Sequence, residues 1–339
     1  MTRNITFRTQ LVGGVSEFCA ESNLLLIQNN LHLVELVVML ARYQEEGVNL
    51  CPKVYLTSDV KGMTAMIPGG DVLKIGSCEL NISGLKDAIK KCAPLATDGW
   101  LIYLCGCSDT VEFGLFRGPT NPISVRVDDV LMTKTEQISV VKLHQVASDC
   151  VEVHCNNGSG FNIFLNHRKE DSSAPLESFD ALISAITSET PEKQAEQTTT
   201  FLSKTLIDSL RKSHGCLIAV TSHTQAPPSL SKDGVFFETP IDYAELVDLT
   251  SKNEVDASDL ISKGSLLQGM LNSDGIVLFD NKARILGYNC FVNLNGQTGA
   301  SINGGARKRA FVALSEKVGD EFSAVFIQSQ DGWSEYKGV

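Results

Sequence analysis

The sequence contains no apolar run long enough to cross a membrane. Its most apolar stretch, 31–41 (LHLVELVVMLA), includes Glu35 and is short, whereas a spanning helix needs about 20 apolar residues. The first ten residues, MTRNITFRTQ, are polar and lack the apolar core of a secretory signal. We therefore expect a cytoplasmic protein without a membrane partner.

Basic residues are few relative to acidic ones, 29 against 40, and the formal net charge is −11. Binding along a nucleic-acid backbone needs clustered positive charge, so we expect no nucleic-acid partner. One short cationic cluster could still bind a small anion against this acidic background.

Pairs of cysteines with zinc-ribbon spacing are also absent. The ten cysteines include no CxxC pair, and the six histidines are scattered. Two groups could bind a metal: Cys105 with Cys107, and Cys150 with His154 and Cys155. Reduced cysteines within apolar runs usually pack as small hydrophobic residues, which is the preferred interpretation here.

The composition, with 43% hydrophobic and 20% charged residues, is that of a globular protein, and 339 residues predict about two domains. The segment 188–200 (SETPEKQAEQTTT) has no aromatic or large apolar residue and is typical of a linker. We therefore predict a domain over 1–190, a linker over 191–200 and a second domain over 201–339.

The N-terminal part has the mixed pattern of an α/β domain and no catalytic signature. Apolar spacing predicts helices over 31–43, 82–92 and 179–186, and strands over 53–56, 100–105, 111–116, 123–127 and 151–153.

The C-terminal part predicts a mixed sheet flanked by helices. Helices are expected over 201–212, 243–249, 256–271 and 306–318. Strands are expected over 216–220, 275–279, 283–292 and 322–328, and the turn 280–282 joins two of them into a hairpin.

One stretch, 298–311 (TGASINGGARKRAF), combines a glycine-rich loop with the start of a helix and three cations. The N–H groups at a helix N-terminus are unpaired, and the helix dipole adds positive charge there. Cations in that turn disfavour the helix unless an anion binds among them, and arginine suits phosphate oxygens. A phosphate site and a solvated basic turn both remain open.

Asp274 and Gly275 stand directly before the apolar strand IVLF. An acidic residue at such a place can bind a divalent metal near phosphates or position a sugar hydroxyl. Asp-Gly is also a common turn dipeptide, so a purely structural role remains open.

Together these two features resemble the catalytic domain of bacterial and archaeal diadenylate cyclases, of the DisA-N type. That domain has an Asp-Gly-Ala motif opening a hairpin and, some thirty residues later, Gly-Thr-Arg-His-Arg-Ala-Ala opening a helix. This chain has Asp274-Gly275-Ile276, then Gly305-Ala306-Arg307-Lys308-Arg309-Ala310-Phe311, then Leu314-Ser315-Glu316 and an apolar strand. The resemblance covers about 201–339. The preceding residues are weakly similar to sensor regions that precede some of these cyclases.

The resemblance implies that two ATP molecules condense into cyclic di-AMP and release two pyrophosphates. It implies that Asp274 binds Mg²⁺ or Mn²⁺ and helps to deprotonate the ribose 3′-hydroxyl. The catalytic residues would be Asp274, Arg307, Lys308 and Arg309. The further nucleotide-binding positions would be Gly275, Ile276, Gly304, Gly305, Ala306, Ser315 and Glu316. Each protomer would hold one ATP, so a face-to-face homodimer or a higher homo-oligomer is implied.

Four positions depart from the family pattern. Ser273 stands where many members have histidine, Ile276 replaces alanine, Ala306 replaces threonine and Lys308 replaces histidine. One hydroxyl donor and one imidazole are thereby lost. A catalytically degenerate sensor of nucleotides or cyclic dinucleotides is therefore the alternative to a cyclase. A protein that serves only as an interaction scaffold is the third candidate.

Overall fold

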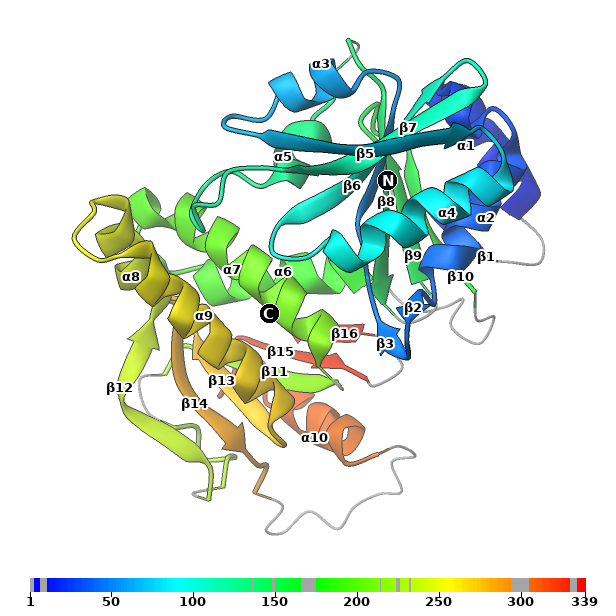
Figure 1. Cartoon of the computed structure of the whole chain (residues 1–339). Coiled ribbons are helices and arrows are strands. Elements are labelled where there is room, and N and C mark those ends of the chain that lie inside the picture. Colours follow the sequence, from blue (N-terminus) through cyan, green and yellow to red (C-terminus); the bar gives the residue numbers. More distant parts are fainter. Residues whose placement is uncertain are drawn as a thin grey trace. The chain divides into compact units, whose positions relative to one another are not determined.

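The computed structural model describes residues 3–6, 11–135, 137–147, 150–165, 175–213, 215–223, 226–231, 233–293, 305–329 and 334–339 (Figure 1). The chain forms two compact units. Unit 1 comprises Met1–Thr120 and Val125–Asp171, and unit 2 comprises Asn121–Ser124 and Ser172–Val339. Both units combine sheets with helices, which confirms the mixed α/β class.

The predicted boundary between the domains is wrong. Residues 191–200, predicted as a linker, begin the 21-residue helix α7 (Glu192–Lys212). Glu, Lys, Gln and Ala are strong helix formers, so a segment can be polar throughout and still be helical. Helix α6 (Pro175–Thr187), assigned to the first domain by the sequence, packs into the core of unit 2. The boundary therefore lies near residue 171 and not near 190.

Unit 1 is built on an eight-stranded sheet with the order β1-β10-β9-β8-β4-β6-β7-β5. Strand pairs β1/β10 and β4/β6 are parallel, and the other neighbours are antiparallel. The strands are β1 (Arg3–Thr6), β4 (Val54–Thr57), β5 (Asp71–Glu79), β6 (Trp100–Cys107), β7 (Thr110–Arg117), β8 (Val140–Ala147), β9 (Cys150–Cys155) and β10 (Gly160–Phe164). A small separate hairpin joins β2 (Gln44–Glu45) and β3 (Val48–Asn49).

Helices cover both faces of this sheet. They are α1 (Leu11–Ser22), α2 (Asn30–Leu40), α3 (Val60–Ala65), α4 (Ile82–Cys92) and α5 (Val127–Leu131), with short 3₁₀ turns at Leu25–Ile27 and Ala93–Leu95. Side-chain oxygens of Asn29, Asp59 and Asn81 accept hydrogen bonds from first-turn amides and so fix the starts of α2, α3 and α4. The predicted helix 82–92 is confirmed without change.

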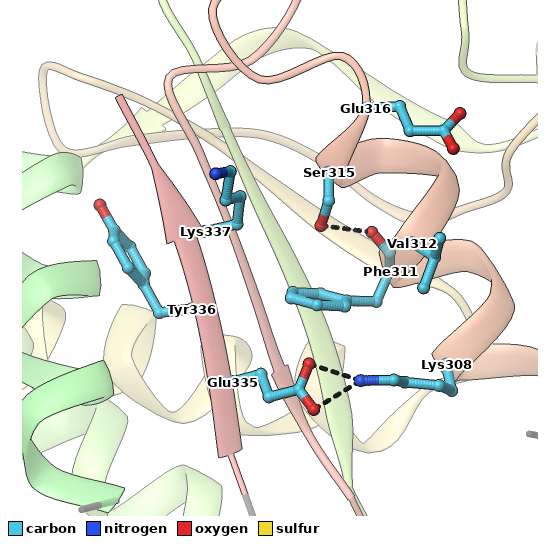
Figure 2. A pocket seen from close by; sticks show the side chains of 8 residues that line it. All are labelled: Lys308, Phe311, Val312, Ser315, Glu316, Glu335, Tyr336 and Lys337. Carbon is cyan, nitrogen blue, oxygen red and sulfur yellow. Dashed lines mark hydrogen bonds and ion pairs between the residues drawn. The ribbon is translucent and has the colours of Figure 1, made fainter. Parts of the chain in front are cut away.

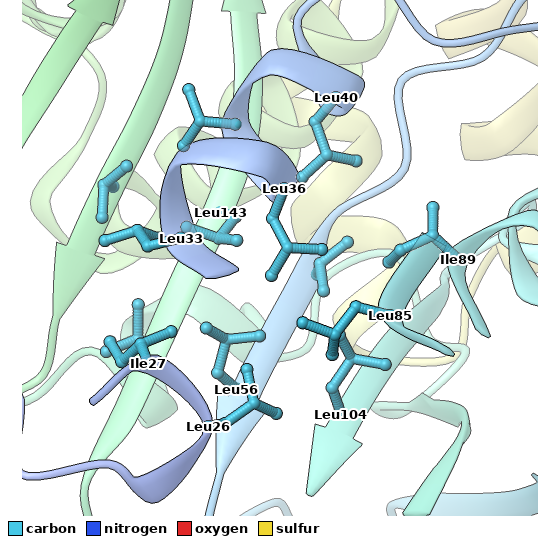
Figure 3. Close-up of a cluster of buried hydrophobic side chains, with 14 of the residues drawn as sticks. Leu26, Ile27, Leu33, Leu36, Leu40, Leu56, Leu85, Ile89, Leu104 and Leu143 are labelled. Atoms are coloured by element: carbon cyan, nitrogen blue, oxygen red, sulfur yellow. The ribbon is translucent and has the colours of Figure 1, made fainter. Parts of the chain in front are cut away.

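The main core of unit 1 lies between the sheet and α1, α2 and α4 (Figure 3). Leu33 and Leu36 of α2 and Leu85 of α4 meet strand residues such as Leu56 and Leu104 there. A smaller cluster packs on the opposite face, under α3 and α5. The alternation of side chains along each strand divides the apolar residues between these two cores.

Asp128 of α5 is buried against β4. Its carboxylate accepts hydrogen bonds from the Tyr55 hydroxyl and from the Lys53 ammonium at 2.8 Å, and the Arg126 guanidinium lies 3.5 Å away. Burial alone would raise the pKa of Asp128, but the charges of Lys53 and Lys142 and the two hydrogen bonds hold that pKa well below its usual range. This cluster anchors α5 to the sheet.

The strand predicted over 123–127 is absent, because these residues form a turn that leads into α5. The Asn121 side chain accepts a hydrogen bond from the amide of Ile123, and the Ser124 hydroxyl donates to the carbonyl of Asn121. Such local side-chain bonds compete with strand pairing.

Unit 2 contains a six-stranded sheet with the order β12-β14-β13-β11-β15-β16, in which only the β11/β13 pair is parallel. The strands are β11 (Cys216–Thr221), β12 (Val235–Asp242), β13 (Ile276–Asp280), β14 (Arg284–Cys290), β15 (Ala324–Gln328) and β16 (Ser334–Gly338). The hairpin predicted around 280–282 is confirmed as β13 and β14.

The helices of unit 2 divide between the two faces of its sheet. Helices α6, α7, α8 (Tyr243–Ser251) and α9 (Ala257–Asn272) pack on one face, and α10 (Ala306–Ser315) packs on the other. Alternating residues of β11 enter the two cores, Ile218 on the four-helix face and Leu217 on the α10 face. In the part of the chain described above, no helix is long and apolar enough to span a membrane.

Candidate functional site

The first half of the candidate site is the short connection between α9 and β13. Asp274 and Gly275 occupy it, directly before the first residue of β13. Gly275 has a φ of +93°, and a Cβ at this position would lie 2.7 Å from the carbonyl oxygen of Cys290. Both features require glycine, because other residues are strained at this φ and have no space there. The turn leaves the side chain of Asp274 83% exposed.

The second half is the N-terminus of α10. Gly305 is the N-cap residue and provides no side-chain cap, and the first turn contains no acidic residue. Ala306 and Arg307 begin the helix, followed by Lys308 and Arg309. The first-turn amides, the positive end of the helix dipole and three cations therefore occupy one turn.

The structure brings Asp274 and Arg307 together. One guanidinium nitrogen of Arg307 lies 4.0 Å from a carboxylate oxygen of Asp274, and the Arg307 side chain is 38% exposed. Residues separated by more than thirty positions thus place an exposed carboxylate beside the cationic end of a helix.

Lys308 points toward a different partner. Its ammonium lies between the two carboxylate oxygens of Glu335 on β16, 2.5 Å from one of them, and 5.2 Å from the centre of the Phe311 ring (Figure 2). Arg309 is exposed. The sequence predicts that the three cations surround one anion. In the structure, they do not converge on one point.

The remaining predicted nucleotide contacts divide into three groups. Ser315 and Glu316 lie at the other end of α10, about 12 Å along the helix from Arg307, and the Ser315 hydroxyl donates to the Phe311 carbonyl. Ile276 is buried in the core under α10, so its side chain is not open to a bound nucleotide. Gly304 lies outside the described residues.

An open pocket of about 380 Å³ lies between α10 and β16, within unit 2. Glu335 and Lys337 of β16 line it together with Lys308 and Ser315 of α10 (Figure 2). No motif in the sequence indicates the β16 residues. The only signal was the alternation of Glu335, Tyr336 and Lys337, which is weak over a strand of five residues.

Cys216, the first residue of β11, is another neighbour of the cationic turn. Burial raises the pKa of its thiol to about 12, while the charge of Arg307 and a hydrogen bond from the Gln328 backbone act in the opposite direction. The thiol is therefore protonated at neutral pH and serves as a packing group.

Within the described ranges, no group of three or more His, Cys, Asp or Glu side chains is arranged to hold a metal ion. A divalent cation at Asp274 would take its other ligands from water and from phosphate oxygens, which is how Mg²⁺ commonly binds beside nucleotides.

The strain at Gly275 gives a first testable expectation. Gly275→Ala should destabilise the protein by about 1–3 kcal/mol, because alanine at this φ is strained and its methyl group meets the Cys290 carbonyl. Urea denaturation measures the change. Gly269→Ala in α9 is the matched control, since a Cβ at Gly269 meets no atom within 4 Å and alanine suits a helix interior. Equal stability of the two variants would contradict the role of the turn.

The chain matches no protein-family model, and no curated protein is significantly similar to it.

Proposed function

We propose that unit 2 is a nucleotidyl cyclase that condenses two ATP molecules into cyclic di-AMP. One observation carries the proposal. At the N-terminus of α10, the Asp274 carboxylate lies 4.0 Å from the Arg307 guanidinium. This pair combines a group that accepts protons or metal with a group that binds phosphate. The sequence resemblance to diadenylate cyclases supplies the reaction.

The chain's own residues would position the triphosphate. The first-turn amides of α10 and the Arg307 guanidinium would hold phosphate oxygens, and Gly305 adds no side chain to this approach. Phosphoryl transfer depends mainly on such positioning and on charge neutralisation. A Mg²⁺ or Mn²⁺ ion held by Asp274 would neutralise charge on the reacting phosphate.

The reaction exchanges one phosphorus–oxygen bond for another. The 3′-oxygen of one ATP forms a bond to the α-phosphorus of the other, and the bond from that phosphorus to pyrophosphate breaks. Asp274 would accept the 3′-hydroxyl proton, a role supported by the exposure of its carboxylate beside the first turn of α10. The 3′-oxygen of the second ATP then forms a bond to the α-phosphorus of the first, and a second pyrophosphate leaves. This step closes the ring, so two units must face each other.

Product analysis tests this proposal. The full chain is incubated with ATP and Mn²⁺ or Mg²⁺, and the nucleotides are separated and identified by mass spectrometry. We expect cyclic di-AMP and pyrophosphate. If ATP binds but remains unchanged over many hours, the proposed cyclase activity is contradicted.

A nucleotide sensor without turnover is the second candidate. The observation that favours it is the pairing of Lys308 with Glu335, which takes one predicted catalytic cation away from the site. Such a sensor would show ATP-dependent thermal stabilisation that Arg307→Ala removes, without any product. Absence of both product and stabilisation would favour an interaction scaffold.

A further inference from the structure

Protein carboxylates already neutralise part of the cationic turn of α10. A carboxylate oxygen of Asp274 lies 4.0 Å from the Arg307 guanidinium, and a carboxylate oxygen of Glu335 lies 2.5 Å from the Lys308 ammonium. Arg309 is exposed and has no ion pair with any residue that the structure describes. Two carboxylates from distant parts of unit 2 thus occupy places that suit an anionic ligand.

We propose that Glu335 is an internal competitor for the phosphate-binding end of α10. Its carboxylate holds the ammonium of Lys308 against β16, and a polyphosphate ligand gains Lys308 only by displacing it. Glu335 therefore lowers the affinity of the site, as a built-in autoinhibitory contact. The assignment of the ligand as ATP rests on the proposed function.

The direction of the Lys308 side chain supports this role. Successive residues of a helix point about 100° apart, so Arg307 faces Asp274 while Lys308 faces β16. The ammonium contacts both oxygens of Glu335 and lies beside the Phe311 ring (Figure 2). Rotation of the lysine side chain can bring the ammonium toward a phosphate bound at the first-turn amides, but the ion pair must then break.

The exposure of the pair makes this exchange feasible. The side chain of Lys308 is 28% exposed and that of Glu335 is 45% exposed. Breaking the pair therefore leaves the Glu335 carboxylate in contact with water and creates no buried charge. Lys337 projects from the same face of β16 two residues later and gives Glu335 an alternative cation.

The size of the effect follows from the same exposure. Exposed ion pairs typically change an equilibrium by about two- to fivefold. A triphosphate carries several negative charges, so it can displace one carboxylate from one ammonium. Both interactions are screened by salt, and the difference should shrink as ionic strength rises.

Calorimetric titration of the full chain with ATP and Mg²⁺ tests the proposal. Glu335→Gln should bind ATP about two- to fivefold more tightly than the wild type. The gain should disappear when Lys308→Met is added, because the released ammonium is then missing. Glu238→Gln is the matched control. It removes the same charge from β12, at the opposite edge of the sheet and about 24 Å from β16, and should leave the affinity unchanged.

Inorganic triphosphate serves as a second probe and separates the two proposals. Equal ATP affinity of the wild type and Glu335→Gln would overturn the competition and leave the nucleotide site intact. Failure of ATP to bind, with tighter binding of inorganic triphosphate by Glu335→Gln, would remove the nucleotide but support the competition. Binding of neither probe by any variant would overturn both.

Discussion

Asp274→Asn is expected to reduce the formation of cyclic di-AMP by at least about a hundredfold. The amide keeps the size of the side chain but loses the negative charge that would hold the metal and accept the 3′-hydroxyl proton. Stability should change by less than about 0.5 kcal/mol, because the Asp274 side chain is 83% exposed. Rates of product formation under saturating ATP measure the effect.

Asp259→Asn is the control for this variant. Asp259 is an exposed acidic residue of α9 in the same unit, so its replacement should leave turnover unchanged. Wild-type turnover in Asp274→Asn would mean that this carboxylate has no part in the chemistry.

Asp128→Asn should destabilise unit 1 by about 3 kcal/mol. Removing one partner of a buried ion pair leaves the other charges uncompensated, which typically costs 3–5 kcal/mol. The lower end applies because Lys53 and Arg126 are partly exposed. Chemical denaturation gives the free energy of unfolding, and hydrogen exchange at peptides from β4 and α5 locates the loss in unit 1.

The neighbouring variant Asp129→Asn is the control for Asp128→Asn. The side chain of Asp129 is 51% exposed and lies 3.8 Å from Arg126, so its loss should cost no more than about 0.5 kcal/mol. Equal losses in the two variants would contradict the anchoring role of Asp128.

The effect of Asp128→Asn should also depend on pH. The folded-state pKa of Asp128 lies well below its usual value, so its stabilising contribution is complete above the unfolded value of about 4. The contribution is lost as the pH falls from there toward the folded-state pKa. The difference between the wild type and Asp128→Asn should therefore be constant near pH 7 and shrink below about pH 4.

Several buried strands could be predicted from the sequence, whereas the interior strands β8 and β10 and the edge strands β5 and β16 were missed. Strands β11, β13 and β15 are continuous apolar runs, because helices cover both faces of the sheet around them. Strands β5 and β16 are terminal strands of their sheets and contain mixed, partly exposed residues. Their sequences therefore lack the periodicity on which a strand prediction rests.

The residues of the candidate site could likewise be predicted only in part. The adjacency of Asp274 and Arg307 was implied by a resemblance that relates two distant motifs, and the fold places them side by side. Glu335 could not be found in this way, since its pairing with Lys308 depends on where β16 lies against α10. The burial of the Ile276 side chain was unforeseen for a similar reason. Strand alternation turns this side chain into the core, a direction that the motif does not specify.

A crystal structure of the full chain with Mg²⁺ and 3′-deoxyATP tests the central claim most directly. This nucleotide lacks the attacking hydroxyl, so it binds without reacting. We expect triphosphate oxygens within hydrogen-bond distance of the first-turn amides of α10 and of Arg307, and the Asp274 carboxylate beside the metal. A nucleotide bound elsewhere, or none bound at saturating concentration, would contradict the assignment of this turn as the phosphate site.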